Sequence, residues 1–296
     1  MILAQLILCL LTVSQAGGSA PVVNFDQDSR IAFSSNMGGN TDIYLLSRNK
    51  LERLTDDPAV DQWPAPDIKG EKIAFTSNRG GNFDIYLMDL KSRKLERLTS
   101  GPRDELTPSW SADGAYLFYE LSTGRNSTQL MKLDMRTGVS TPLLPDPPFS
   151  SCIVPFASPK GDDIFFTGKV FLGWLVAKYN IPGKRYTELT KSGSCRPKAS
   201  PDGAKVAYVC HDDDRLGDVF MMNPDGGGKV NLTKKRPDSY DYYPCFSPDG
   251  TMIVFSSSPK AKGKDAYQLH TLDLKTGEVR RILTTAGNDS FPVWFK

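Results

Sequence analysis

The segment Lys72–Leu90 (KIAFTSNRGGNFDIYLMDL) repeats Arg30–Arg48 (RIAFSSNMGGNTDIYLLSR) at an offset of 42 residues. In both copies an apolar triplet is followed by Gly-Gly-Asn, then by Asp-Ile-Tyr, and finally by Leu-Glu-Arg-Leu-Thr. The triplet recurs every 42 to 47 residues and begins at Ile31, Ile73, Leu117, Ile164, Val206 and Ile253. An internal period of this length is typical of repeat architectures such as propellers, and it outweighs other fold signals.

Each copy contains short strand signals that are rich in β-branched and aromatic residues and are bounded by turn residues. A Ser-x-Asp-Gly turn or a close relative precedes the triplet at Ser111–Gly114, Ser158–Gly161, Ser200–Gly203 and Ser247–Gly250. Proline presets φ in such a turn and glycine accepts a positive φ. Six copies with four strand signals each predict an all-β fold, a six-bladed β-propeller of four-stranded blades.

The end of the chain indicates how the ring closes. Phe291–Phe295 resembles Thr107–Trp110, the strand that precedes a turn in the third copy. We therefore expect this C-terminal strand to complete blade 1, whose other strands come from the N-terminal side, because closure removes an open sheet edge. Val22–Phe25 is the alternative source of that strand.

Composition narrows the function classes. The length of 296 residues suggests about two domains, but the six repeats predict one ring. Lys plus Arg number 36 and Asp plus Glu number 34, which argues against nucleic-acid binding through a basic surface. Only 2 histidines are present, so we expect neither a metal site nor a cofactor.

The N-terminal segment has the pattern of a secretory signal peptide. Residues 1–20 contain no charged side chain, Ile2–Val13 is almost entirely apolar, and Ser14 and Ala16 are small. We predict a signal peptide over residues 1–20, cleaved after Ala16, followed by one propeller domain over residues 21–296. The alternative is an uncleaved N-terminal anchor, since the segment lacks an initial Lys or Arg. The prediction implies a periplasmic or secreted monomer with no membrane span after cleavage.

These repeats resemble the WD40-like repeats of the TolB propeller family. The Ser-Pro-Asp-Gly turn, the Ile-Ala-Phe triplet, Ser77–Tyr86 and Leu-Glu-Arg-Leu-Thr carry the resemblance, which covers roughly residues 25–296. The fourth copy departs most, because Phe165–Tyr179 lacks Gly-Gly-Asn and Asp-Ile-Tyr. The resemblance implies a propeller without the N-terminal domain of TolB. It implies a role in the cell envelope only weakly, because one fold hosts many functions.

One acidic position recurs near the expected mouth of the channel. An acidic residue lies three positions before an inner-strand proline in four copies, at Asp61, Glu105, Asp241 and Asp289. These carboxylates are candidates for a partial ring that captures a cation or a Lys- or Arg-bearing partner segment. Alternatively, each accepts backbone N–H bonds within its loop. Their aromatic neighbours Trp63 and Tyr243 are candidates for pocket walls or for packing between blades.

Four cysteines follow the signal segment, and an exported chain favours disulfides. If Ser200 pairs with Lys205 across the Pro-Asp-Gly turn, Cys195 and Cys210 become direct cross-strand neighbours. That register predicts a disulfide between them. Cys152 and Cys245 belong to inner strands two blades apart, so we assign them no partner.

The sequence favours a binding protein over an enzyme. No Gly-x-Ser-x-Gly elbow, His-Glu-x-x-His motif or P-loop occurs, so no catalytic residue is assigned. We expect an exported, non-enzymatic propeller that presents its crossover-loop face and channel mouth to a protein or peptide partner. The alternative is a carbohydrate-active lyase or hydrolase, since oligogalacturonate lyase is a similar propeller. Only His211 and His270 are available to such chemistry, and His270 lies within an expected strand.

Overall fold

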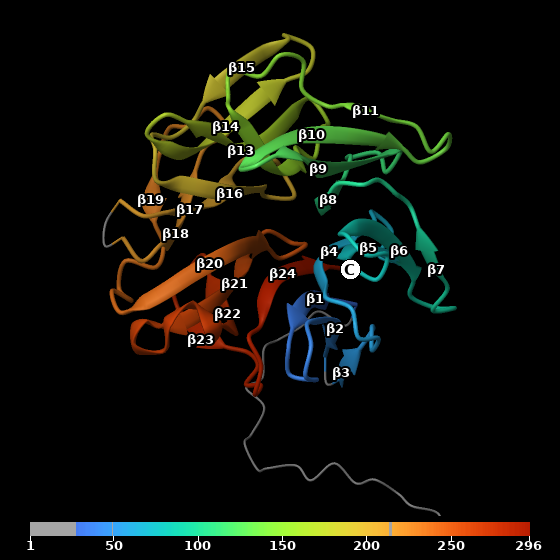
Figure 1. Cartoon of the computed structure of the whole chain (residues 1–296). Coiled ribbons are helices and arrows are strands. Elements are labelled where there is room, and N and C mark those ends of the chain that lie inside the picture. Colours follow the sequence, from blue (N-terminus) through green and yellow to red (C-terminus); the bar gives the residue numbers. More distant parts are fainter. Residues whose placement is uncertain (1–27, 49, 213–214) are drawn as a thin grey trace, which may run out of the picture.

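The computed structural model describes residues 28–48, 50–212 and 215–296. Within these ranges it contains 24 β-strands and one short 3-10 helix, η1 (Lys260–Asp265). The strands form six four-stranded sheets, which are arranged as blades around a central axis (Figure 1). The predicted all-β, six-bladed propeller is therefore confirmed.

The blades follow one another along the chain, with the inner strand named first in each. Blade 1 contains β24 (Ser290–Phe295), β1 (Arg30–Ser35), β2 (Asp42–Ser47) and β3 (Lys50–Arg53). Blade 2 contains β4 (Asp61–Pro66), β5 (Lys72–Ser77), β6 (Asp84–Asp89) and β7 (Leu95–Arg97). Blade 3 contains β8 (Glu105–Trp110), β9 (Tyr116–Gly124), β10 (Ser127–Asp134) and β11 (Ser140–Pro142).

The second half of the ring has the same strand order. Blade 4 contains β12 (Ser151–Ala157), β13 (Asp163–Val170), β14 (Gly173–Asn180) and β15 (Arg185–Glu188). Blade 5 contains β16 (Ser194–Ala199), β17 (Val206–Cys210), β18 (Asp218–Met222) and β19 (Val230–Asn231). Blade 6 contains β20 (Ser239–Phe246), β21 (Met252–Pro259), β22 (Gln268–Asp273) and β23 (Val279–Arg281).

The apolar triplets form the core between blades. Ile31, Phe33 and Phe75 are at most 1% exposed, because each second strand is covered on both of its faces. In one such cluster, Ala32 of blade 1 packs with Ile73 and Phe75 of blade 2. Burial of these side chains provides the main driving force that holds neighbouring blades together.

The Ser-x-Asp-Gly turns fix the connection from the inner strand to the second strand. The Ser200 hydroxyl donates to Asp202 Oδ1 at 2.5 Å and accepts the Lys205 N–H at 2.9 Å. Gly203 has a φ of 71°, a conformation that glycine adopts without steric cost. The same bonds recur around Ser111 and Ser247, so one face of the ring carries compact, self-bonded turns.

The C-terminal strand closes the ring, as predicted. In blade 1, β24 pairs antiparallel with β1 and aligns Ile31 with Trp294 and Ala32 with Val293. Each inner strand also contacts the inner strands of the neighbouring blades all the way around the ring. The alternative strand Val22–Phe25 and the predicted signal peptide lie outside the described residues.

No helix in the described part of the chain is long and apolar enough to cross a membrane.

Candidate functional site

A β-bulge in each inner strand aims one side chain toward the axis. The strand register shifts at the residue that precedes the inner-strand proline in all six blades. That residue has a positive φ of 49° to 58° in each blade: Trp63, Thr107, Val154, Arg196, Tyr243 and Phe291. Bulky residues rarely adopt this conformation. A bulge re-aims a side chain and tolerates a proline that lacks an N–H.

We call these six residues the channel ring, since all of them line a cavity of about 160 Å³, the channel cavity. Neighbouring blades bring part of the ring into direct contact. The Arg196 guanidinium lies 4.8 Å from the Tyr243 ring centroid, and Tyr243 lies 4.3 Å from Phe291. Phe291 lies 5.2 Å from Trp63. Four successive blades thus form an arc of one arginine and three aromatic rings, while Thr107 and Val154 complete the circle with small side chains.

The channel opens into a larger cavity of about 760 Å³, which we call the mouth cavity. Arg196, Tyr243 and Phe291 line both cavities, so the two cavities are adjacent. The remaining wall comes from the starts of inner strands and from loops between second and third strands, with Asn36, Gly173, His211 and Lys264 among the lining residues. This is the crossover-loop face, opposite the Ser-x-Asp-Gly turns. The volume is within the range of small-ligand sites.

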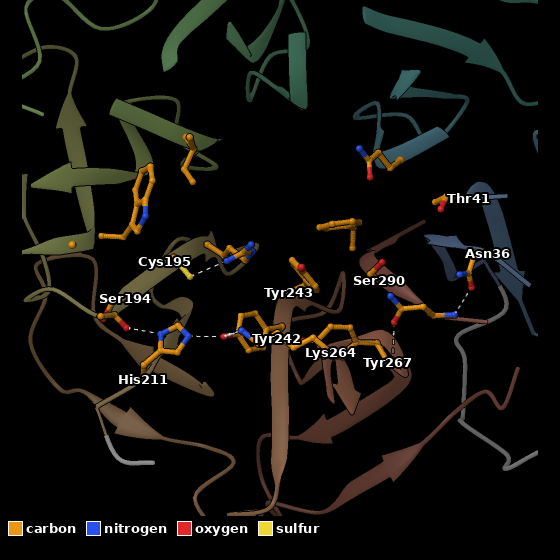
Figure 2. A pocket seen from close by; sticks show the side chains of 18 of the residues that line it. Asn36, Thr41, Ser194, Cys195, His211, Tyr242, Tyr243, Lys264, Tyr267 and Ser290 are labelled. Atoms are coloured by element: carbon orange, nitrogen blue, oxygen red, sulfur yellow. Dashed lines mark hydrogen bonds between the residues drawn. The ribbon is translucent and has the colours of Figure 1, made fainter. Parts of the chain in front are cut away.

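A hydrogen-bond chain crosses one wall of the mouth cavity (Figure 2). His211 Nδ1 lies 2.8 Å from the Gly193 carbonyl oxygen and Nε2 lies 2.5 Å from the Tyr242 hydroxyl. A carbonyl only accepts, so Nδ1 is the donor to Gly193; in the tautomer that carries only this proton, Nε2 accepts from the Tyr242 hydroxyl. The Lys264 ammonium donates to the same hydroxyl at 3.1 Å. This chain fixes Tyr242 and holds Lys264 at the rim.

Charge is distributed unevenly along the axis. The described residues that line the mouth cavity include Arg196 and Lys264 but no Asp or Glu. Below them, the channel cavity adds Lys198 and one acid, Glu120. Glu120 Oε1 accepts the Val154 N–H at 2.7 Å and a bond from the Thr107 hydroxyl. Burial raises the pKa of Glu120 to about 7, so its charge is only partial at neutral pH.

The four predicted carboxylates do not line either cavity. Asp61, Asp241 and Asp289 are fully buried and Glu105 is 7% exposed, which corrects the expected ring at the channel mouth. Their backbone N–H groups bond to carbonyl oxygens of the preceding blade, as Asp61 does to Thr41 at 2.8 Å. The carboxylates therefore occupy the joints between blades rather than the surface of the channel.

Side chains from the same blade or from the crossover that leads into it surround these buried carboxylates. Both Asp61 oxygens accept bonds from the Arg79 guanidinium, at 3.0 and 2.8 Å. Asp241 lies 3.3 Å from Arg236 Nε, and Asp289 accepts a hydroxyl bond from Thr285 at 2.9 Å. Burial raises the pKa of all four groups, that of Asp289 to about 6. These partners are side chains, whereas the alternative sequence interpretation expected backbone N–H groups.

The two aromatic candidates, unlike the acids, do line the cavities. Trp63 lines the channel cavity and Tyr243 lines both cavities. Both also pack against Phe291 of blade 1, so they form channel walls and inter-blade contacts at once.

The predicted disulfide between Cys195 and Cys210 is not formed. All four described cysteines are free and buried, and Cys195 pairs with Val209 whereas Ser194 pairs with Cys210. The expected register holds at Ala199, but the bulge at Arg196 shifts it by one residue. A one-residue shift turns side chains to opposite faces, so Cys195 and Cys210 join different core clusters.

Blade 4 contributes an exposed apolar hairpin tip beside the mouth. The long strands β13 and β14 meet at Phe171 and Leu172, which are 102% and 78% exposed. Leu172 and Trp174 also line the mouth cavity. This tip lies where the fourth repeat lacks the Gly-Gly-Asn and Asp-Ile-Tyr segments of the first two copies.

The sequence pattern did not identify Arg196, because the pattern concerned an acidic residue three positions before the proline. Ser194 occupies that position in blade 5. The informative position is the residue immediately before the proline, because the bulge aims that residue at the axis in every blade. His270, by contrast, lies within β22, where burial lowers its pKa to about 4.

Comparison with known proteins shows the family through a family model, and solved structures show the same fold. A family model described as the TolB beta propeller domain matches residues 11–191. An uncharacterized protein of Agrobacterium fabrum is 30% identical over 211 residues, covering 69% of this chain and 67% of that protein. The crystal structure of TolB from Acinetobacter baumannii superposes with a TM-score of 0.79 at 22% identity, covering 91% of this chain and 67% of that one. Oligogalacturonate lyase from Vibrio parahaemolyticus superposes with a TM-score of 0.55 at 16% identity, covering 88% and 74%.

Proposed function

Because this chain belongs to the TolB beta-propeller family, we propose that it is an exported, non-enzymatic binding protein of the cell envelope. In this proposal the crossover-loop face and the channel mouth engage a protein or peptide partner. In this proposal the protein is a periplasmic monomer that binds one protein or peptide partner.

The asymmetry of the two faces carries the proposal. The crossover-loop face has a cavity of about 760 Å³ and, at its rim, the exposed apolar tip Phe171–Leu172. The opposite face carries the compact Ser-x-Asp-Gly turns, which bond to themselves. Recessed cavities with aromatic walls and nearby apolar anchors are typical of binding surfaces. Loops on a rigid scaffold are also the usual location of binding residues.

Site-specific photo-crosslinking tests which face binds. A benzophenone amino acid replaces Leu172 at the mouth in one variant and Ile68 on the turn face in the other. The two side chains are matched, since both are large, apolar and more than half exposed, at 78% and 60%. We expect a crosslinked partner from Leu172 in intact cells and none from Ile68. A partner captured only through Ile68 would contradict the proposal.

Export is tested independently. If signal peptidase cleaves after Ala16, the protein recovered from the periplasm or medium begins at Gly17. Mass spectrometry of the intact protein decides between this form and a retained N-terminal anchor.

One observation favours a second candidate, a carbohydrate-active lyase or hydrolase. His211 is one of only 2 histidines in the chain, and it lies in the wall of the mouth cavity, hydrogen-bonded to Tyr242. Incubation of the purified protein with uronate polymers and neutral glycans tests this candidate. Turnover that is lost in His211→Ala would favour the enzyme over the binding protein.

A further inference from the structure

The channel ring contains one permanent cation, Arg196, that has no salt-bridge partner in the described part of the chain. Arginine has five N–H donors and stays protonated in proteins. Among the described residues, no carboxylate forms a salt bridge with Arg196, whose guanidinium donates to Cys195 Sγ at 3.0 Å and is also hydrogen-bonded to the neutral Tyr243 phenol. A cation that is partly removed from water without an anion costs free energy. The guanidinium therefore has unused donors in the wall of the cavity.

The groups around Arg196 balance its positive charge only in part. Tyr242 and Tyr243 present their rings to the guanidinium at 5.6 and 4.8 Å, and burial raises the pKa of both phenols, so they stay neutral. Glu120, the acid that lines the channel cavity, interacts electrostatically with Arg196 but forms no salt bridge with it; it is hydrogen-bonded to blades 3 and 4 and is only partly ionised at neutral pH.

Two further basic residues line the same cavities. Lys198 lies deeper in the channel, 4.5 Å from the Phe156 ring centroid, and burial lowers its pKa, which weakens its contribution of positive charge. Lys264 lies at the rim, held by Tyr242. Charges of one sign along a recess with apolar walls focus the potential and attract ligands of the opposite sign.

We propose that the channel mouth binds a carboxylate, held by Arg196, on a ligand whose apolar part packs against Tyr243 and Phe291. This inference rests on the proposed function and specifies it: the partner segment that enters the mouth carries an acidic group beside an aromatic or apolar one. The expected ligand is therefore an anion, whereas the sequence pattern led us to expect that the mouth captures a cation.

The geometry suits such a ligand. A guanidinium binds a carboxylate through two parallel N–H···O bonds, which gives direction as well as strength. The aromatic arc from Tyr243 through Phe291 to Trp63 continues from the arginine with ring contacts of 4.3 and 5.2 Å. A planar or apolar group adjacent to the carboxylate therefore meets aromatic faces.

Calorimetric and NMR titrations of the whole chain test the proposal with capped dipeptides. The probes are acetyl-Phe-Asp-amide and acetyl-Phe-Asn-amide, which differ by one charge. We expect the aspartate probe to bind with a Kd of roughly 1 mM, as suits a small ligand. We expect the asparagine probe to bind at least roughly tenfold more weakly, because a hydrogen bond to a charged group is lost.

Variants connect the binding to Arg196. Arg196→Met should weaken the aspartate probe roughly tenfold or more. The affinity of Arg196→Lys for the aspartate probe should lie between that of the unaltered protein and that of Arg196→Met, because lysine keeps the charge but loses the two parallel hydrogen bonds. Lys69→Met is the matched control, since it removes one exposed cation from the turn face and should change nothing. If Arg196→Met does not fold, Lys264→Met at the rim replaces it, with an expected loss of roughly twofold to fivefold.

D-galacturonate distinguishes a peptide carboxylate from a free organic acid. If galacturonate binds in an Arg196-dependent way and the peptide does not, the carboxylate site is supported. Its ligand is then a small organic acid, which contradicts the proposed protein partner. Equal binding of the two peptides, unchanged binding in Arg196→Met, or no binding of any probe would overturn the inference. If no probe binds but a partner is still crosslinked through position 172, the carboxylate site is refuted and the proposed binding function is retained.

Discussion

Two kinds of charged residue in this propeller have different roles, which burial distinguishes. Asp61 is fully buried and paired with Arg79, whereas Arg196 lies in a cavity wall with unused donors. The sequence pattern that marks Asp61 identifies a joint between blades. The residue two positions later, Trp63, is the one that enters the channel.

Asp61→Ala should lower the free energy of unfolding by about 2 kcal/mol, less than a fully buried ion pair because Arg79 stays 21% exposed. Asp57→Ala is the matched control, since Asp57 bonds to the same Arg79 but is 33% exposed. It should cost about 0.5 kcal/mol or less. Urea denaturation measures both values. Equal costs would contradict the structural role of Asp61, and binding of the aspartate probe should persist in both variants.

Glu120 makes stability depend on pH. Its pKa is about 7 in the folded protein and near 4.3 when unfolded, so the folded state binds more protons between these values. Stability from this group therefore falls as pH rises through that window. Glu120→Gln removes the titration, so the unaltered protein should lose about 2 kcal/mol more than the variant between pH 5 and pH 8. Denaturation curves at both pH values measure this difference, and parallel losses would refute it.

At the scale of elements, the bulge in the inner strand decides what the channel contains. It places six bulky or branched residues at positive φ, which is a strained conformation for them. Those residues line the channel as a consequence, and the strand register beyond each bulge shifts by one residue.

Val154→Gly tests this strain. Val154 has a φ of 52°, and glycine adopts this conformation freely, so relief of strain offsets the lost side-chain contacts. Val279→Gly in β23 is the control, since Val279 is also half-buried but lies in an ordinary strand. We expect Val154→Gly to cost about 1 kcal/mol less than Val279→Gly in urea denaturation. A larger cost at Val154 would contradict the bulge as a source of strain.

The period of the repeat was sufficient to predict the strands, their order and the turns. It could not predict the bulge, because no residue type marks the residue before each proline: Trp, Thr, Val, Arg, Tyr and Phe all occur there. The disulfide prediction failed for this reason, since it assumed a continuous register from Ser200 to Cys195. The candidate acids do recur with the period of the repeat. Their burial between blades depends on tertiary packing, which the period alone does not reveal.

At the scale of the whole molecule, stability depends on closure by the last strand. Trp294 on β24 is 7% exposed and pairs with Ile31 of β1, so it connects the two ends of the described chain. Trp174 on β14 is the matched control, because it is half-buried at the mouth cavity.

Trp294→Ala should lower the free energy of unfolding by about 3 to 5 kcal/mol, the usual cost of truncating a buried aromatic side chain. Trp174→Ala should cost clearly less, because part of its surface already faces water. Chemical denaturation followed by circular dichroism measures both. Equal effects would contradict the importance of closure.

The central claim is that the crossover-loop face binds a partner through the channel mouth and that Arg196 holds it. The most direct measurement is the yield of partner crosslinked through the benzophenone at position 172, with and without Arg196→Met, and with position 68 as background. We expect a strong crosslink at position 172 that falls roughly tenfold with Arg196→Met, and none at position 68. A crosslink at position 172 that is unchanged by Arg196→Met would contradict the role of Arg196. A partner crosslinked only at position 68 would contradict the binding face itself.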